Sequence, residues 1–150
     1  MSQHSIKTKG NHQEFIKKVC ETGVVWCLKN SEGLATSNST IYEGRKGEPI
    51  GLFCFWSDKK LAQDCVLDNW DDYTPNQITL SEFIEDWCLG ISNDGYMVGS
   101  NFDQNMIGSE VDALDLIIAL SKELKAQKKE IKLKKFDHLN TLVDEIEKLG

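Results

Sequence analysis

The chain has 150 residues, of which 40% are hydrophobic and 27% charged, and its formal net charge is -7. This length and composition are typical of one globular domain with a sizeable core. The negative charge argues against nucleic acid as the main partner, and no apolar run approaches the ~18 residues of a membrane span. The polar start MSQHSIKTKGNH lacks the apolar core of a signal peptide, so we expect a cytoplasmic protein without membrane attachment.

The first third of the chain predicts a helix and two strands. A helix is expected over residues 12–21, where apolar residues recur at helical spacing, and Gly23 ends it. The β-branched and aromatic run at 24–29 predicts a strand. A turn in which Gly33 supplies a positive φ leads to a more polar strand at 34–42, so we expect an antiparallel hairpin.

The strongest folding signal lies in the middle of the chain. Residues 50–56 carry apolar side chains at almost every position, whereas a strand exposed on one face alternates polar and apolar residues. We therefore expect this strand to be central and covered on both sides. Ser57 is placed to cap the helix that follows, with Asp58 in its first turn, and we expect that helix to end at Trp70.

The second half predicts a capped helix, one further strand and a helical tail. Thr79 and Glu82 form a capping box after a short extended segment, and Gly90 is the expected end of the helix that they begin. Residues 96–102 are expected to form the last strand. After a cap at Ser109, apolar residues at helical spacing predict either one long helix or two, with a break near residues 134–138.

These elements predict an α+β fold with a mostly antiparallel sheet of about four to five strands and packed helices. We assign residues 1–120 to a single α+β domain. Residues 121–150 form a lysine-rich helical C-terminal extension that either packs on this domain or projects from it. The region 122–135 has a net charge of +5, whereas 58–115 has a net charge of -11.

The sequence shows no arrangement of residues that predicts catalysis. The five cysteines are an odd number embedded in apolar patterns, so we interpret them as buried free thiols. There is no Cys-x-x-Cys pair, and the three histidines lie in unrelated contexts. We therefore predict no catalytic residue, no cofactor and no metal ligand, and we favour a protein that is not an enzyme.

One short segment has the composition of a binding site. Trp70 is followed by Asp71, Asp72 and Tyr73, and aromatic anchors beside charged residues are common at protein interfaces. We predict that these four residues bind a partner, and a basic protein would complement the acidic region. The alternative reading is that each tryptophan packs in the core and that the acidic residues only form a solvated surface.

A long, ordered pattern of residues runs from about residue 15 to residue 120. It comprises Val25, Trp26, Gly33, Leu34, Ala35, Pro49, Trp56, Leu61, Ala62, Trp70, Tyr73, Pro75, Ile78, Leu80, Glu82, Phe83, Trp87, Gly90, Asp94, Gly95, Val98 and Gly99. In this pattern the chain resembles the small bacterial proteins of domain-of-unknown-function family 2750. It departs from them at Ser57, where the family often has proline, and in its lysine-rich tail. The resemblance implies a compact α+β domain in the bacterial cytosol, and it implies no activity, cofactor or catalytic residue.

Three functional hypotheses follow. The first is a non-catalytic protein-binding module, in a specific form an immunity or antitoxin-type protein that covers a basic partner. The second is an enzyme or binder of a small metabolite with a pocket beside the central strand. The third is a homodimer formed through the C-terminal helix.

Overall fold

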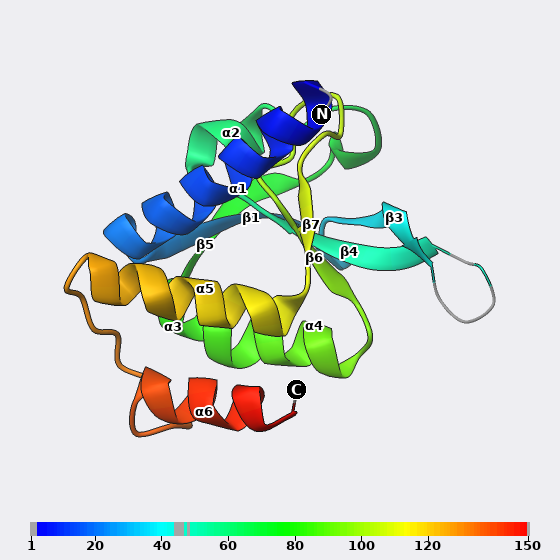
Figure 1. The fold of residues 1–150 in the computed structure, drawn as a ribbon. Helices are drawn as coiled ribbons and strands as arrows, with labels where there is room; N and C mark the ends of the chain where they lie inside the picture. The colour runs from blue at the N-terminus through cyan, green and yellow to red at the C-terminus, as the bar shows by residue number, and fades with distance from the viewer. Residues whose placement is uncertain (1–2, 44–46, 48, 150) are drawn as a thin grey trace.

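A computed structural model describes residues 3–43, 47 and 49–149, and it describes side chains within 12–39, 47, 50–68 and 70–149. The strands form two small sheets, and Figure 1 shows most of the longer helices gathered on one side of them. The elements in chain order are α1 (Gln3–Thr22), β1 (Val24–Asn30), β2 (Gly33–Leu34), β3 (Thr36–Glu43), β4 (Pro49–Phe55), α2 (Lys59–Gln63), the 3-10 turn η1 (Asp68–Trp70), β5 (Thr74–Thr79), α3 (Leu80–Glu82), the π-helical segment η2 (Phe83–Cys88), α4 (Leu89–Asn93), β6 (Met97–Ser100), β7 (Ser109–Val111), α5 (Ala113–Ala126) and α6 (Leu139–Leu149). The α+β fold class predicted from the sequence is confirmed.

The strands divide between two sheets that share one bridge. The first sheet has the order β2-β1-β5 and is antiparallel, and the second has the order β3-β4-β6-β7, in which β4 and β6 run parallel. Trp26 and Trp56 exchange both backbone hydrogen bonds at 2.8 Å, which joins β1 to the end of β4. The sheet pairing is therefore mostly antiparallel, as expected, with the β4–β6 pair as the exception.

The hairpin predicted after β1 is only partly formed. β2 pairs with β1 over two residues, and then the chain crosses into the second sheet at Ala35. Ala35 donates its N–H to the carbonyl of Leu28 in β1 at 2.9 Å, and its own carbonyl accepts from Cys54 of β4 at 3.3 Å. The expected strand at 34–42 is consequently broken, and its larger part, β3, pairs with β4 instead of β1.

β4 is central, as its apolar pattern predicts, because β3 lies on one side of it and β6 on the other. Its alternating side chains enter two different cores. Leu52, Cys54 and the adjoining Trp56 belong to a cluster with α2 and Trp70. Phe55 belongs to a larger cluster with the helices, where its ring packs edge-to-face on Phe83 at 4.7 Å between centroids.

The helical layer is built from α1, the continuous helix α3-η2-α4, α5 and α6 (Figure 1). The predicted cap is confirmed, since Thr79 Oγ1 accepts from the Glu82 N–H at 3.1 Å. Gly90 does not end this helix, which continues to Asn93 and stops before Gly95, whose φ is +80°. Nothing lies within 4 Å of where a Cβ on Gly90 would be, so a larger residue would fit here and the helix can continue through this position.

Two other predicted caps are displaced. Asp58, not Ser57, caps α2 by accepting from the Leu61 N–H at 2.9 Å, and α2 ends at Gln63 well before Trp70. Ser109 lies in β7, a strand that was not predicted from the sequence. The cap of α5 is Asp112, which accepts from the Asp115 N–H at 2.9 Å.

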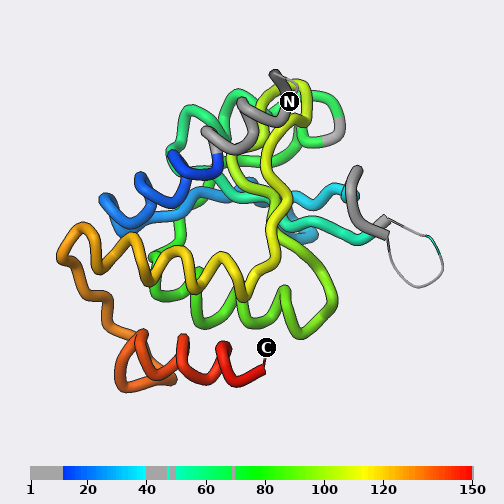
Figure 2. Tube along the Cα trace, viewed as in Figure 1, coloured from blue at the N-terminus to red at the C-terminus, as the bar shows by residue number. Residues whose placement is uncertain are grey.

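The C-terminal region forms two helices, α5 and α6, separated by residues 127–138. Figure 2 follows this path from α5 back along the domain. The buried carboxylate of Glu85 accepts from the backbone N–H of Lys134 at 2.5 Å and of Lys135 at 3.2 Å. Three apolar side chains of α6 are buried within the same chain, those of Leu142, Val143 and Ile146, whereas Leu149 is 78% exposed. A homodimer through α6 stays a prediction, and it would have to use the other side of this helix.

Candidate binding cavity

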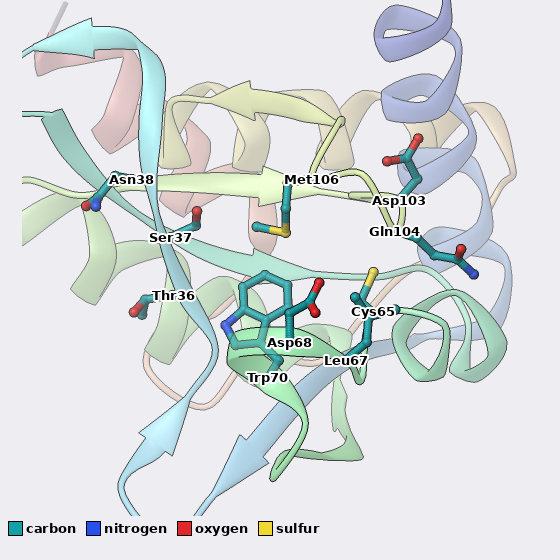
Figure 3. A pocket seen from close by; sticks show the side chains of 10 residues that line it. All are labelled: Thr36, Ser37, Asn38, Cys65, Leu67, Asp68, Trp70, Asp103, Gln104 and Met106. Carbon is teal, nitrogen blue, oxygen red and sulfur yellow. The ribbon is translucent and has the colours of Figure 1, made fainter.

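A cavity of about 330 Å³ opens between three segments that are distant in sequence (Figure 3). The first segment is the start of β3, the second is the link from α2 to η1, and the third is the loop between β6 and β7. The lining residues are Thr36, Ser37, Asn38, Cys65, Leu67, Asp68, Trp70, Asp103, Gln104 and Met106. The cavity borders β3, which is the direct neighbour of the central strand β4.

Trp70 supplies a large apolar surface to the cavity. Its side chain is only 6% exposed, and its ring packs edge-to-face on Trp56 with 5.9 Å between centroids. Trp56 in turn donates from Nε1 to the carbonyl of Phe102 at 2.8 Å, and the Cys65 thiol donates to the same carbonyl at 3.2 Å. These contacts therefore connect the cavity wall at Trp70 and Cys65 to Phe102, at the start of the β6–β7 loop.

The rim combines exposed apolar side chains with carboxylates. Leu67 is 36% exposed and Met106 is 43% exposed, although both are large hydrophobic residues. Asp68 and Asp103 bring two carboxylates, and none of the lining side chains is cationic. The cavity therefore favours an apolar group that also carries positive charge.

The β6–β7 loop is held by its own polar side chains. Asn101 accepts from the Ser57 N–H at 2.8 Å and donates to the Ser57 hydroxyl at 3.1 Å. Asp103 Oδ1 accepts from the backbone N–H groups of Asn105 at 2.8 Å and Ile107 at 3.1 Å. Ser57, which the sequence predicts to be a helix cap, instead anchors this loop.

Two lining residues have left-handed backbone conformations. Asp68 has φ 53° and Met106 has φ 62°. Aspartate tolerates this region because its short side chain can hydrogen-bond locally, whereas methionine does not have that compensation and the conformation costs about 1–2 kcal/mol. Such residues concentrate at ligand-binding sites in folded proteins.

The structure separates the four residues predicted to bind a partner. Trp70 is buried and lines the cavity, whereas Asp71 and Asp72 are exposed in the turn that follows, and Tyr73 is half-buried. Asp72 Oδ2 accepts from the Asn30 side-chain amide at 3.2 Å, which ties this turn to the end of β1. An interface here would contact the two aspartates directly, and it would reach Trp70 only through the cavity.

The thiols of this protein are not activated nucleophiles. Burial raises the pKa of the cavity thiol, Cys65, to about 11, and it raises the pKa of Cys20 to about 12. Burial also raises the pKa of Cys27 to about 11, and those of Cys54 and Cys88 further. Because the thiolate is the reactive form, these cysteines are weak nucleophiles near neutral pH.

A serine and a histidine meet elsewhere in the fold without forming an open site. His12 Nδ1 lies 2.9 Å from the hydroxyl of Ser100, and burial lowers the pKa of His12. Ser100 is fully buried, so a substrate could not reach its hydroxyl. Within the residues that the structure describes, no group of three or more His, Cys, Asp or Glu side chains could hold a metal ion, and no helix could cross a membrane.

Comparison with known proteins places this chain in a family. The model of a family described as "Protein of unknown function (DUF2750)" matches residues 12–120, and this range includes every residue that lines the cavity. No curated protein and no solved structure matched the chain. Because the family match spans well over half of its length, the chain belongs to the DUF2750 family.

Proposed function

We propose that this protein is a non-catalytic binding module of the bacterial cytoplasm that covers a basic surface on a partner protein, as immunity and antitoxin-type proteins do. The supporting observation is the acidic cavity with its exposed apolar rim. Leu67 and Met106 offer apolar contact area, and Asp68 and Asp103 lie beside them. Apolar anchors surrounded by charge are the usual composition of a specific interface.

The charge distribution around the cavity supports a basic partner. Asp68 and Asp103 line the cavity, and the exposed pair Asp71 and Asp72 directly follows the cavity residue Trp70. A negatively charged surface can accelerate association with a positively charged protein by roughly 10-fold to 1,000-fold at low salt. The aspartates would then set the association rate, and the cavity would determine how long the complex lasts.

The raised thiol pKa values support binding over catalysis. Cys65 is the one cysteine that lines the cavity, and its thiol is protonated near neutral pH because burial raises its pKa to about 11. Its hydrogen is also donated to the Phe102 carbonyl. A nucleophile would need the opposite shift and a neighbouring base.

The test is capture of a partner from the host, followed by kinetics with matched charge variants. Asp71→Lys with Asp72→Lys should slow association by about tenfold or more and flatten its salt dependence. Glu145→Lys with Glu147→Lys makes the same change in charge at exposed positions of α6. Equal association rates for the two double variants would contradict the proposed surface.

A small ligand is the second candidate, and the cavity volume favours it. About 330 Å³ falls at the lower end of the range of small-molecule sites, roughly 300–1,000 Å³. Native mass spectrometry of protein purified from its host would detect such a ligand. A stoichiometric retained metabolite, released by Trp70→Ala and kept by Trp87→Ala, would support this function over partner binding.

A further inference from the structure

We infer that the cavity receives a lysine or arginine side chain from an extended basic segment of the partner, and that this segment pairs with the open edge of β3. This inference rests on the proposed function, since it specifies how the basic partner is held.

A long side chain with a positively charged end would match the cavity, which offers both apolar surface and a carboxylate. Trp70, Leu67 and Met106 present apolar surface, which suits the methylene stem of lysine or arginine. Asp68 offers a carboxylate to the charged end, and its side chain has no hydrogen-bond or ion-pair partner within the described part of the chain. Hydrogen bonds between charged groups are stronger than neutral ones, so this contact would discriminate against uncharged side chains.

The wall formed by β3 is also the edge of a sheet. Within the described residues, β3 has β4 as its single strand neighbour. Residues of an antiparallel pair alternate between pointing their backbone groups toward the partner strand and away from it. The Ala35 carbonyl accepts from Cys54 of β4, and Ser37 is the next residue that faces β4, opposite Leu52. The backbone groups of Thr36 and Asn38 therefore point away from β4.

Both residues with outward-pointing backbone groups also line the cavity. Thr36, Ser37 and Asn38 line the cavity, and Thr36 and Asn38 are exposed (Figure 3). A peptide that adds a strand to a sheet edge gains affinity from main-chain hydrogen bonds and specificity from pockets for its alternate side chains. A strand added along β3 would thus run beside a pocket that suits one of its side chains.

Two other occupants of the cavity are less favourable than a basic partner: a second copy of this chain and the chain's own lysine-rich segment. A second copy pairing through β3 would bring two sets of the carboxylates Asp68 and Asp103 together, and that like-charge contact is unfavourable. The lysine-rich segment of this chain packs on the helical side instead. There Lys129 Nζ binds the Glu21 carbonyl at 2.5 Å and Glu85 holds the backbone of Lys134.

The test uses a defined probe, the peptide acetyl-Thr-Val-Lys-Val-Thr-amide, titrated into the 15N-labelled full chain up to millimolar concentration. We expect the largest amide shifts at Thr36 and Asn38, together with a shift of the Trp70 indole. Replacement of the peptide lysine by arginine should preserve binding, and replacement by norleucine should weaken it by about tenfold, since a charge-assisted hydrogen bond contributes at least ~1.5 kcal/mol.

Asp68→Asn should remove the preference for lysine over norleucine, whereas Asp94→Asn, an exposed acid in the turn after α4, should retain it. Equal binding of the lysine and norleucine peptides to the unmodified chain would overturn the inference. Shifts confined to residues away from 36–38 and Trp70, or no shifts at all, would overturn it as well. The charge-reversal kinetics with Asp71 and Asp72 are independent of these results, so the inference can fail while the proposed function stands.

Discussion

Among the glycines that the structure describes, Gly108 is the one where an added methyl group would make the closest contacts. An ideal Cβ there would lie 2.2 Å from Phe102 Cδ1 and 2.8 Å from Phe102 Cα, and real Cβ contacts are not found below 3.0 Å. The second of these contacts is with backbone, so a rotation of the Phe102 ring cannot relieve it. The Phe102 ring also lies close to Gly99, because its Cε1 is 2.9 Å from where a Cβ on Gly99 would be.

Gly108→Ala should therefore cost about 1–3 kcal/mol from overpacking. The Phe102 carbonyl accepts from Trp56 Nε1 and from the Cys65 thiol, so displacement of Phe102 would weaken two further hydrogen bonds, and a neutral one contributes about 1 kcal/mol. We expect a total loss of about 2–4 kcal/mol in the free energy of unfolding, measured by urea denaturation with tryptophan fluorescence.

Gly90→Ala is the matched control because it makes the same chemical change in a different setting. Gly90 lies inside α4, and nothing is within 4 Å of its ideal Cβ. Alanine is a better helix former than glycine by about 1 kcal/mol, so this variant should be more stable than the unmodified chain. A Gly108→Ala protein as stable as the unmodified chain would refute the close packing of Phe102 against this loop.

Three further predictions concern other parts of the molecule. Glu85→Ala should lower the free energy of unfolding by about 1.5–3 kcal/mol and expose residues 127–138 to trypsin, since the carboxylate binds this segment. Asp86→Ala, which removes an exposed ion pair, should cost less than about 1 kcal/mol, and equal proteolysis of the two variants would contradict the role of Glu85. Met106→Gly should leave stability unchanged or raise it by up to ~1 kcal/mol in urea denaturation, because glycine adopts a positive φ without strain, yet it should weaken binding of the lysine peptide. A glycine variant with both properties unchanged would show that Met106 is not part of the site. For His12, burial lowers the pKa below the ordinary value of 6.5, so its stabilising contribution is complete above pH 6.5 and is lost as the pH falls from 6.5 toward the lowered pKa. His12→Gln should therefore reduce the loss of stability between about pH 7.5 and about pH 5, and urea midpoints that fall equally in both proteins would contradict this.

The central strand could be predicted because its signal is local. Apolar side chains on both faces of β4 require two cores, and the structure has one cluster around Trp56 and another around Phe55. The cap at Thr79 was predictable for the same reason, since its hydrogen bond spans three residues. The fold class follows from such local patterns taken together.

The features that depend on tertiary contacts could not be predicted in this way. Ser57 has the composition of a helix cap, but its backbone and hydroxyl bind Asn101, which is 44 residues away. The crossing of the chain between the two sheets at Ala35 also cannot be predicted from the neighbouring sequence, because the contacts of Ala35 with β1 and β4 depend on how the two sheets meet. In both cases a distant hydrogen bond overrides the local preference.

The candidate site was located only in part. The acidic neighbours of Trp70 drew attention to this residue, and it does line the cavity, but the structure buries most of it against Trp56. The residues opposite it, at 36–38 and 103–106, carry no sequence signal of their own, since they are ordinary polar residues and one methionine in a strand and a loop. They become a site only because the fold brings three distant segments together.

The most direct measurement of the central claim is hydrogen exchange of this protein in complex with its captured partner. Binding at the acidic cavity predicts slower exchange in three segments at once: 36–38, 65–73 and 101–106. The exchange of α6 should remain as in the free protein. Slower exchange confined to α5 and α6, with the three cavity segments unchanged, would contradict the assignment of this surface.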